Sequence, residues 1–432
     1  MTNNKRIIKA ECAYEIEPLK HPFAFKGNAL SCIWQTVVRL TTDSDYGVGL
    51  GIQSILWSDG AVFEKLGEEE GNRAMFRVTE YATSLLSGAE AEYPIDWLNK
   101  NLSRIIDYAK DVTGVANLRT TFVLNALVPL DFAMWQLWYK QKGMTSFDGI
   151  YPFDGVRVSE LLNVPLITYK TPIDEVPVLA KSGASLLKIK LGSNPDASGD
   201  KAQMLEWDKN RLFEIHNAVK DIKTPHTKSG KILYYPDLNG RYESKEDLIS
   251  LLDFAKEKGI IDRIAILEEP FDEGNEINVS DLPVRIAADE SAHSAEDVKK
   301  RFELGYKILA LKPIAKTLSM TILMAECAKK YDMSCFCADL TVNPTMVTVN
   351  QCVAARLAPL PEMKIGIIES NGAQNYSNWD KMTEYHPLYG KGYTGIEDGV
   401  FRLSEEFYKR SGGIFESFAH YEEIIEKGVP RG

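Results

Sequence analysis

Six charged side chains stand at the ends of five short apolar runs in the second half of the sequence. They are Lys188, Lys190, Asp237, Glu268, Asp289 and Lys312. Three carboxylates gathered in one place repel each other and raise one another's pKa values unless a cation lies among them. Oxygen ligands without His or Cys suit Mg²⁺, which keeps water or substrate in its remaining positions. The acids therefore predict a magnesium site, provided that the chain brings them together.

The spacing of these residues suggests that it does. The intervals from Lys190 through Asp237, Glu268 and Asp289 to Lys312 are 47, 31, 21 and 23 residues. All but the first are close to the length of one strand–helix unit, and the first leaves room for an insertion. Any one acid could be an ordinary helix N-cap or loop ion pair. Three acids in strand order favour a shared site.

The lysines predict acid–base chemistry. Removing a proton next to a carboxylate builds a second negative charge on its oxygens, which a divalent cation stabilises. A lysine that takes this proton must be neutral near neutral pH, so its pKa must be lowered. Lys188 lies two residues from Lys190 on the same strand face and carries a charge that would lower the pKa of Lys190.

Regular alternation of strands and helices after residue 155 supplies the framework for these residues. Strands are predicted at 164–169, 185–191, 231–237, 264–268, 284–288, 307–312, 333–338 and 364–369. Helices are predicted at 173–182, 205–220, 245–258, 294–303, 318–330 and 341–357. Eight such strands indicate an α/β fold, a parallel (β/α) barrel of the TIM type whose active site lies at the carboxyl ends of its strands. An open doubly wound sheet is the alternative, but no G-x-G-x-x-G fingerprint opens any unit.

The amino-terminal part has a different pattern. Residues 5–65 are rich in strand formers, and 72–142 show helical periodicity with Pro129 near a kink or a late helix start. Phe23 and Phe25 lie in a loop, where they either belong to the core or close over a ligand. Three units are expected, and they comprise an α+β capping domain at 1–147, the barrel at 148–375 and a segment at 376–432 that returns to the capping domain.

Composition excludes several functions. A formal net charge of −11 argues against nucleic acid and anionic membranes as partners. The first ten residues lack the apolar run of a signal peptide, and the six cysteines form no C-x-x-C pair. We therefore expect a cytoplasmic protein with reduced thiols, which acts on a small molecule and forms a homo-oligomer.

Five short motifs, taken in order, resemble those of the enolase superfamily, in particular its muconate lactonizing enzyme subgroup. They are Lys188-Ile189-Lys190, Asp237-x-Asn239, Glu268-Glu269-Pro270, Asp289-Glu290-Ser291 and Leu311-Lys312. That subgroup includes dipeptide epimerases and o-succinylbenzoate synthases. The resemblance implies Mg²⁺ held by Asp237, Glu268 and Asp289, with Lys190 and Lys312 on opposite faces of a bound carboxylate. Its lysine base and Mg²⁺-stabilised enediolate are known chemistry of the superfamily.

The substrate is less well specified. Dipeptide epimerases carry Asp-x-Asp at the end of the eighth strand, where this chain has Glu369-Ser370-Asn371, and Asp339 follows the seventh strand. None of the six histidines falls at either strand end, which disfavours the histidine base of the mandelate racemase subgroup. The candidates for substrate binding are Phe23, Phe25, Asn239, Asp339 and Glu369.

These observations predict Mg²⁺-dependent abstraction of a proton α to a carboxylate, with Lys190, Lys312 and Lys188 as catalytic residues. Racemisation or epimerisation of an amino-acid or dipeptide-like substrate is the first expectation. Syn-elimination or cycloisomerisation, which needs only one lysine as base, is the alternative within the enzymes. A barrel that binds a metal without catalysis remains a third interpretation, which the presence of two lysines disfavours.

Overall fold

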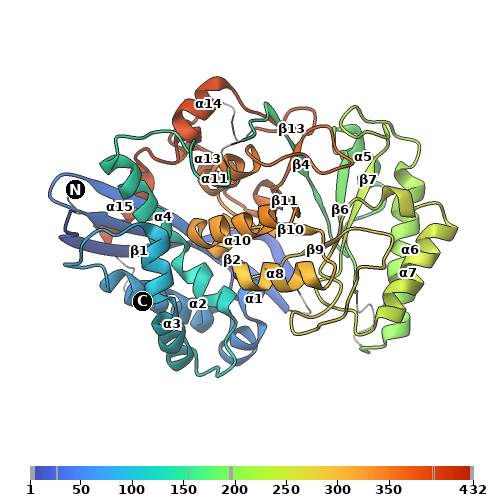
Figure 1. Cartoon of the computed structure of the whole chain (residues 1–432), viewed down its shortest axis with the longest axis horizontal. Helices are drawn as coiled ribbons and strands as arrows, with labels where there is room; N and C mark the ends of the chain where they lie inside the picture. The colour runs from blue at the N-terminus through green and yellow to red at the C-terminus, as the bar shows by residue number, and fades with distance from the viewer. Residues whose placement is uncertain are drawn as a thin grey trace.

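The computed structural model describes residues 5–25, 28–153, 155–193, 198–391, 393 and 395–428, and the side chains of 23–25 fall outside this description. Its first part is a three-stranded antiparallel sheet followed by helices. The strands are β1 (Lys9–Phe25), β2 (Asn28–Thr41) and β3 (Tyr46–Gln53), and the helices are α1 (Ile55–Ser58), α2 (Gly60–Ser84), α3 (Pro94–Thr113) and α4 (Thr120–Gln141). Figure 1 shows this part beside a second, larger part that contains most of the remaining strands.

Close packing of β3 on α4 explains the alternating glycines of this strand. A Cβ at Gly49 would lie 2.0 Å from the carbonyl oxygen of Pro129, and one at Gly47 would lie 2.2 Å from that of Ala133. Only glycine allows the two backbones to approach so closely. Pro129 lies in the interior of α4, so the late helix start considered from the sequence is wrong.

The second part is an eight-stranded parallel barrel. Its strands are β4 (Glu160–Val164), β5 (Leu166–Ile167), β6 (Leu186–Lys190), β7 (Leu233–Asp237), β8 (Leu267–Glu268), β9 (Ile286–Ala288), β10 (Ile308–Leu311), β11 (Ser334–Cys337) and β12 (Gly366–Glu369). The sheet runs β4-β12-β11-β10-β9-β8-β7-β6-β5. β4 and β5 are two pieces of one strand separated by Pro165, so the sheet closes on itself. The predicted barrel is confirmed.

Helices follow the barrel strands as predicted. They are α5 (Glu175–Lys181), α6 (Lys201–Val219), α7 (Lys245–Glu257), α8 (Ala295–Glu303), α9 (Pro313–Lys316), α10 (Leu318–Lys330) and α11 (Pro344–Ala354), with a 3₁₀ turn, η1, at Ile261–Arg263. α6 lies within the long interval between Lys190 and Asp237, where the sequence leaves room for an insertion. No helix in the described part of the chain is long and apolar enough to cross a membrane.

The carboxyl-terminal segment contacts both parts of the molecule. It contains α12 (Gly372–Asn375), α13 (Trp379–Glu384), β13 (Val400–Arg402), α14 (Glu405–Arg410), η2 (Ser411–Gly413) and α15 (Ala419–Lys427). β13 pairs antiparallel with β4 of the barrel, whereas α15 packs against β1 and β2. This segment therefore ties the barrel to the amino-terminal sheet.

One contact between the two parts of the molecule lies at the start of α10, six residues after Lys312 in the chain. Asp131 of α4 accepts hydrogen bonds from the backbone N–H groups of Leu318 and Ser319, at 2.9 and 3.1 Å, in the first turn of α10. The indole N–H of Trp135, also on α4, donates to the side-chain hydroxyl of Ser319 at 3.0 Å. The helix that follows the sixth barrel strand is therefore held by a helix of the amino-terminal part.

Candidate active site

The predicted residues meet at the carboxyl ends of the barrel strands. Lys190, Asp237 and Glu268 are the last residues of β6, β7 and β8. The strand register pairs Lys190 with Asp237 and Asp237 with Glu268, so the three form one row across neighbouring strands. Asp289 and Lys312 directly follow β9 and β10. The barrel therefore brings together side chains that are up to 122 positions apart in the chain.

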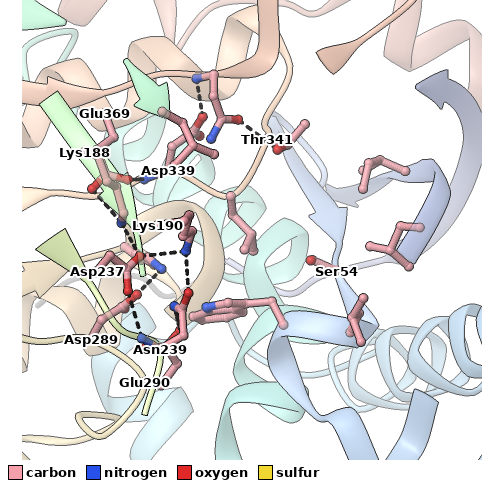
Figure 2. A pocket seen from close by; sticks show the side chains of 18 residues that line it. Ser54, Lys188, Lys190, Asp237, Asn239, Asp289, Glu290, Asp339, Thr341 and Glu369 are labelled. Carbon is pink, nitrogen blue, oxygen red and sulfur yellow. Dashed lines mark hydrogen bonds and ion pairs between the residues drawn. The ribbon is translucent and has the colours of Figure 1, made fainter. Parts of the chain in front are cut away.

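Lys188 lies at the centre of this group. Its ammonium is 2.9 Å from Glu268 Oε1, 3.0 Å from Glu369 Oε1 and 3.1 Å from Asp237 Oδ2, as Figure 2 shows for Glu369. It also donates to the Tyr235 hydroxyl at 3.0 Å. Burial lowers the pKa of Lys188, but the three carboxylates outweigh that effect and hold it well above its ordinary value.

Lys190 faces the adjacent strand. Its ammonium donates to Asp237 Oδ2 at 2.6 Å and to Asn239 Oδ1 at 2.7 Å. The amide nitrogen of Asn239 donates to Glu290 Oε1 at 3.0 Å, so this side chain links a lysine of β6 to the loop after β9. Asn239 has a φ of 46°, a left-handed conformation that asparagine tolerates better than most residues. The predicted substrate-binding asparagine thus contacts Lys190.

Lys312 and Lys316 share one carboxylate. Lys312 donates to Asp289 Oδ2, and Lys316 donates to the Asp289 carbonyl at 2.6 Å and to Oδ1 at 3.3 Å. Trp57 of α1 places its ring 4.5 Å from the Lys312 ammonium. Burial lowers the pKa of Lys312, yet Asp289 and Glu290 raise it overall. The lowered pKa that a lysine base requires is therefore not found for Lys312, because an acid partner stabilises the ammonium.

A cavity at the barrel mouth is lined by both parts of the molecule. The amino-terminal part contributes Leu30, Ile33, Ser54, Leu56 and Trp57, and the barrel contributes Leu166, Leu340 and the polar groups. One wall is thus mainly apolar and the other is charged, as the close-up in Figure 2 shows. Such a cavity suits a small molecule that has a charged end and an apolar end.

The expected lid can be followed only in part. The side chains of Phe23 and Phe25 lie outside the described residues, although the β1 backbone at Phe23 pairs with Leu30, which lines the cavity. The glycines of β3 pack against α4 rather than over the mouth. Ser54, Leu56 and Trp57, which follow β3, line the cavity instead.

Loops after β11 and β12 form the other side of the cavity. Glu369 contacts Lys188 through Oε1 and accepts the Asp339 backbone N–H at 3.2 Å through Oε2. Asp339 Oδ2 in turn accepts the backbone N–H of Asn371 at 2.6 Å. The two acids predicted to bind substrate therefore lie side by side, with Glu369 nearer the lysines.

The donor set fits a hard divalent cation in type and in charge. Five carboxylate residues line the cavity against three lysines, with Glu268 buried beneath them. Burial, followed by the charge of Asp237, holds the pKa of Glu268 well above its ordinary value. The acids are nevertheless paired with lysines, and no three His, Cys, Asp or Glu side chains in the described ranges are arranged to hold a metal. A bound Mg²⁺ would compete with the lysines for Asp237, Glu268 and Asp289.

Several residues of the site were not singled out from the sequence. Glu290 was visible within a quoted motif, and Lys316 lies one helical turn after Lys312, so both carried a local signal. Trp57 and Tyr235 reach the lysines only through the fold, and no sequence pattern pointed to them. The sequence thus identified the charged groups at the strand ends but not the aromatic groups that pack against them.

Several solved protein structures share this fold with the chain at low sequence identity. An N-succinyl Arg/Lys racemase from Bacillus cereus has a TM-score of 0.65 and 15% identity, with 96% of this chain and 98% of that chain covered. A dipeptide epimerase from Enterococcus faecalis, complexed with Mg and the dipeptide L-Leu-L-Tyr, has a TM-score of 0.64 and 15% identity over 94% and 99%. A member of the enolase superfamily from Listeria innocua has a TM-score of 0.65 and 14% identity over 98% and 97%.

These likenesses extend over nearly the whole of each chain, while the identities are low. No family model and no curated protein matches the sequence. The resemblance inferred from the motifs is thus confirmed at the level of the fold, and the chain folds as the mandelate racemase/muconate lactonizing proteins of the enolase superfamily do.

Proposed function

We propose that this protein abstracts the proton α to a carboxylate and is a racemase or epimerase of an amino-acid or dipeptide-like substrate. One observation carries the proposal. Lys190 and Lys312 line the same cavity, and three strands separate β6 from β10 in either direction around the barrel. Two lysines on opposite walls can reach the two faces of one carbon, which inversion of configuration requires.

The other residues of the site have roles that follow from their contacts. Mg²⁺, bound by Asp237, Glu268 and Asp289, would supply positive charge to the carboxylate oxygens as the proton leaves. Lys188 brings a fixed positive charge to the same end of the cavity. Asn239 orients Lys190 through the contact at 2.7 Å. Leu30, Leu56 and Trp57 shield the site from water, which strengthens the electrostatic contacts inside.

Elimination is the second candidate, and one contact favours it. Lys312 is held as an ammonium by Asp289, with Lys316 on the same carboxylate. A lysine in that state serves well as a cation that stabilises developing negative charge and poorly as a base. In this mechanism Lys190 alone would remove the α-proton, and the substrate would expel a leaving group to form a double bond.

Solvent-deuterium exchange distinguishes the two mechanisms. Purified enzyme is incubated in D₂O with single enantiomers of N-acyl amino acids and dipeptides, and α-deuterium is measured by NMR. For a racemase, Lys190→Ala should lose exchange with one enantiomer and Lys312→Ala with the other. Loss of all exchange in only one of the two variants, with release of a leaving group, would establish elimination instead.

A matched control separates chemistry from general damage. Lys209→Ala removes a lysine of α6 that pairs with Glu206 at 3.0 Å and does not line the cavity. This variant should exchange both enantiomers at the wild-type rate. If wild-type protein exchanges no proton with any member of the panel, the proposal is wrong.

We also propose that the protein acts in the cytoplasm on a small-molecule carboxylate. All six cysteines are free thiols, as expected in a reducing compartment. The net charge of −11 does not suit a polyanionic partner. A homo-oligomer stays a prediction from the sequence.

A further inference from the structure

Asp339 lies in a hydrogen-bond network that connects the cavity to the amino-terminal sheet. Its Oδ2 accepts the Asn371 backbone N–H, and Asn371 Oδ1 accepts the Thr341 hydroxyl at 2.8 Å. The Thr341 carbonyl accepts the Tyr376 hydroxyl at 2.6 Å, and that hydroxyl accepts an N–H of Gln35 on β2 at 2.9 Å. The loop that carries Asp339 is therefore fixed from two sides.

One atom in this network has no partner. Asp339 Oδ1 is buried and makes no hydrogen bond with any described residue, and the residue as a whole is only 6% exposed. Asp339 also forms no ion pair in the described part of the chain, whereas neighbouring Glu369 is paired with Lys188. Leaving a buried acceptor unsatisfied costs free energy, so native structures rarely do so without a reason.

Two other residues that line the cavity also have a buried polar atom without a partner. Trp57 Nε1 and Glu290 Oε2 are also buried without a hydrogen-bond partner, and both residues line the same cavity as Asp339. The three residues come from α1 and from the loops after β9 and β11, so no local feature of one segment explains them. A ligand that fills the cavity would satisfy them together.

The apolar wall limits what that ligand can be. Leu30, Ile33, Leu166 and Leu340 line the same cavity as Asp339, so a donor group bound by Asp339 would share the cavity with hydrocarbon side chains. In such surroundings a compound that lacks the donor leaves Asp339 Oδ1 both unpaired and cut off from water. Discrimination against that compound should therefore be strong.

We propose that Asp339 determines specificity by accepting, through Oδ1, a hydrogen bond from an N–H or O–H group that the substrate carries in addition to its carboxylate. The donor is an ammonium, an amide N–H or a hydroxyl. This inference rests on the proposed function for the position of the carboxylate at the lysines. It adds the chemical class of the rest of the substrate, which is a donor group flanked by apolar surface.

Binding of a matched series tests the inference without any turnover. Glycyl-, glycolyl- and propionyl-L-leucine differ only in a terminal ammonium, hydroxyl or methyl group, and β-alanine, 3-hydroxypropanoate and butanoate form a shorter series. Dissociation constants are measured by calorimetry for the wild type, Asp339→Asn and Asp339→Leu. In at least one series the wild type should bind a donor compound about ten- to a hundredfold more tightly than the methyl compound.

The variants identify the donor. Asp339→Leu should abolish the preference in either case, because no acceptor remains. Asp339→Asn should abolish a preference for the ammonium, which needs the negative charge, and retain part of a preference for the hydroxyl. The control is Asp148→Asn, which removes a carboxylate paired with Arg356 at 2.9 Å outside this cavity and should leave the preference unchanged.

Two results would overturn the inference. One is a wild-type protein that binds none of the six compounds or binds the donor and methyl members equally. The other is a preference that persists in Asp339→Leu, because the donor would then bind elsewhere. An Asp339-dependent preference in a protein that exchanges no α-proton would leave this inference standing and remove the proposed function.

Discussion

Replacement of Lys188 by methionine should reveal how the barrel mouth balances its charges. Methionine keeps most of the length and apolar volume of the lysine stem and removes the ammonium. That ammonium lies within 3.1 Å of carboxylate oxygens of Asp237, Glu268 and Glu369, and its side chain is only 6% exposed. Removing one partner of a buried ion pair leaves an uncompensated charge and typically costs about 3–5 kcal/mol. We expect a loss of that size in the free energy of unfolding.

The loss should depend on pH in a definite direction. Without the ammonium, the pKa of Glu268, which burial and Asp237 already hold well above its ordinary value, should rise further. A carboxyl group with a raised folded-state pKa favours the native state at low pH and ceases to do so as the pH rises through that pKa. The difference between Lys188→Met and the wild type should therefore be larger at pH 7.5 than at pH 5.5.

Equilibrium unfolding in urea, followed by tryptophan fluorescence at both pH values, measures the difference. Lys427→Met is the matched control, since its ion pair with Glu423 lies on the exposed surface of α15 and should contribute less than about 1 kcal/mol. If Lys188→Met destabilises no more than this control at pH 7.5, Lys188 does not neutralise the buried carboxylates and the charge argument fails.

Three further predictions concern the metal, a buried acid and the packing of β3. Glu268→Gln should remove calorimetric Mg²⁺ binding with an unchanged circular dichroism spectrum, and full α-proton exchange by the wild type in EDTA would contradict the metal proposal. Burial raises the pKa of Asp208 to about 7, so part of the stability present at acid pH should disappear between about pH 4 and 7. Asp208→Asn should flatten that pH dependence of the unfolding free energy, and an unchanged slope would refute the assignment. Gly49→Ala would place a Cβ 2.0 Å from the Pro129 carbonyl and should cost about 1–3 kcal/mol or more in thermal unfolding. Gly60→Ala, with no atom within 4 Å, should be nearly neutral, and equal melting temperatures for the two variants would disprove the packing argument.

The barrel was predictable because its strands and helices carry strong local signals. Strands buried on both faces appear as continuous apolar runs, and helices that cover them begin at capping residues. The predicted helix at 294–303 is observed as α8, Ala295–Glu303, with Ser294 as its N-cap. The predicted helix at 318–330 matches α10, which Thr317 caps.

Segments with interrupted patterns were predicted less well. α2 begins at Gly60, although the pattern indicated helices only from residue 72. Gly67, with a φ of 75°, interrupts the helical geometry between these two positions. The first barrel strand begins at Glu160 rather than 164, and Pro165 divides it. In both places a residue that normally ends an element interrupts one that continues beyond it.

Contacts made through space determine the state of the lysines, so the sequence could not reveal it. From the chain alone, Lys188 was expected to lower the pKa of Lys190 by repulsion. In the folded protein the charge of Lys188 is compensated by carboxylates from three other strands, and Asp289 raises the pKa of Lys312 in the same way. Proximity in sequence predicted which groups meet, but their balance depends on partners far apart in the chain.

This balance connects the two main assignments at the site. A lysine can accept the α-proton only when its own proton is weakly held, whereas burial lowers the pKa of Lys312 less than Asp289 and Glu290 raise it. Asp289 is also one of the acids proposed to hold Mg²⁺, and it forms an ion pair with Lys312. A divalent cation on Asp289 would offset the negative charge that raises the pKa of Lys312. The assignment of Lys312 as a base therefore depends on the metal assignment, and the two stand or fall together.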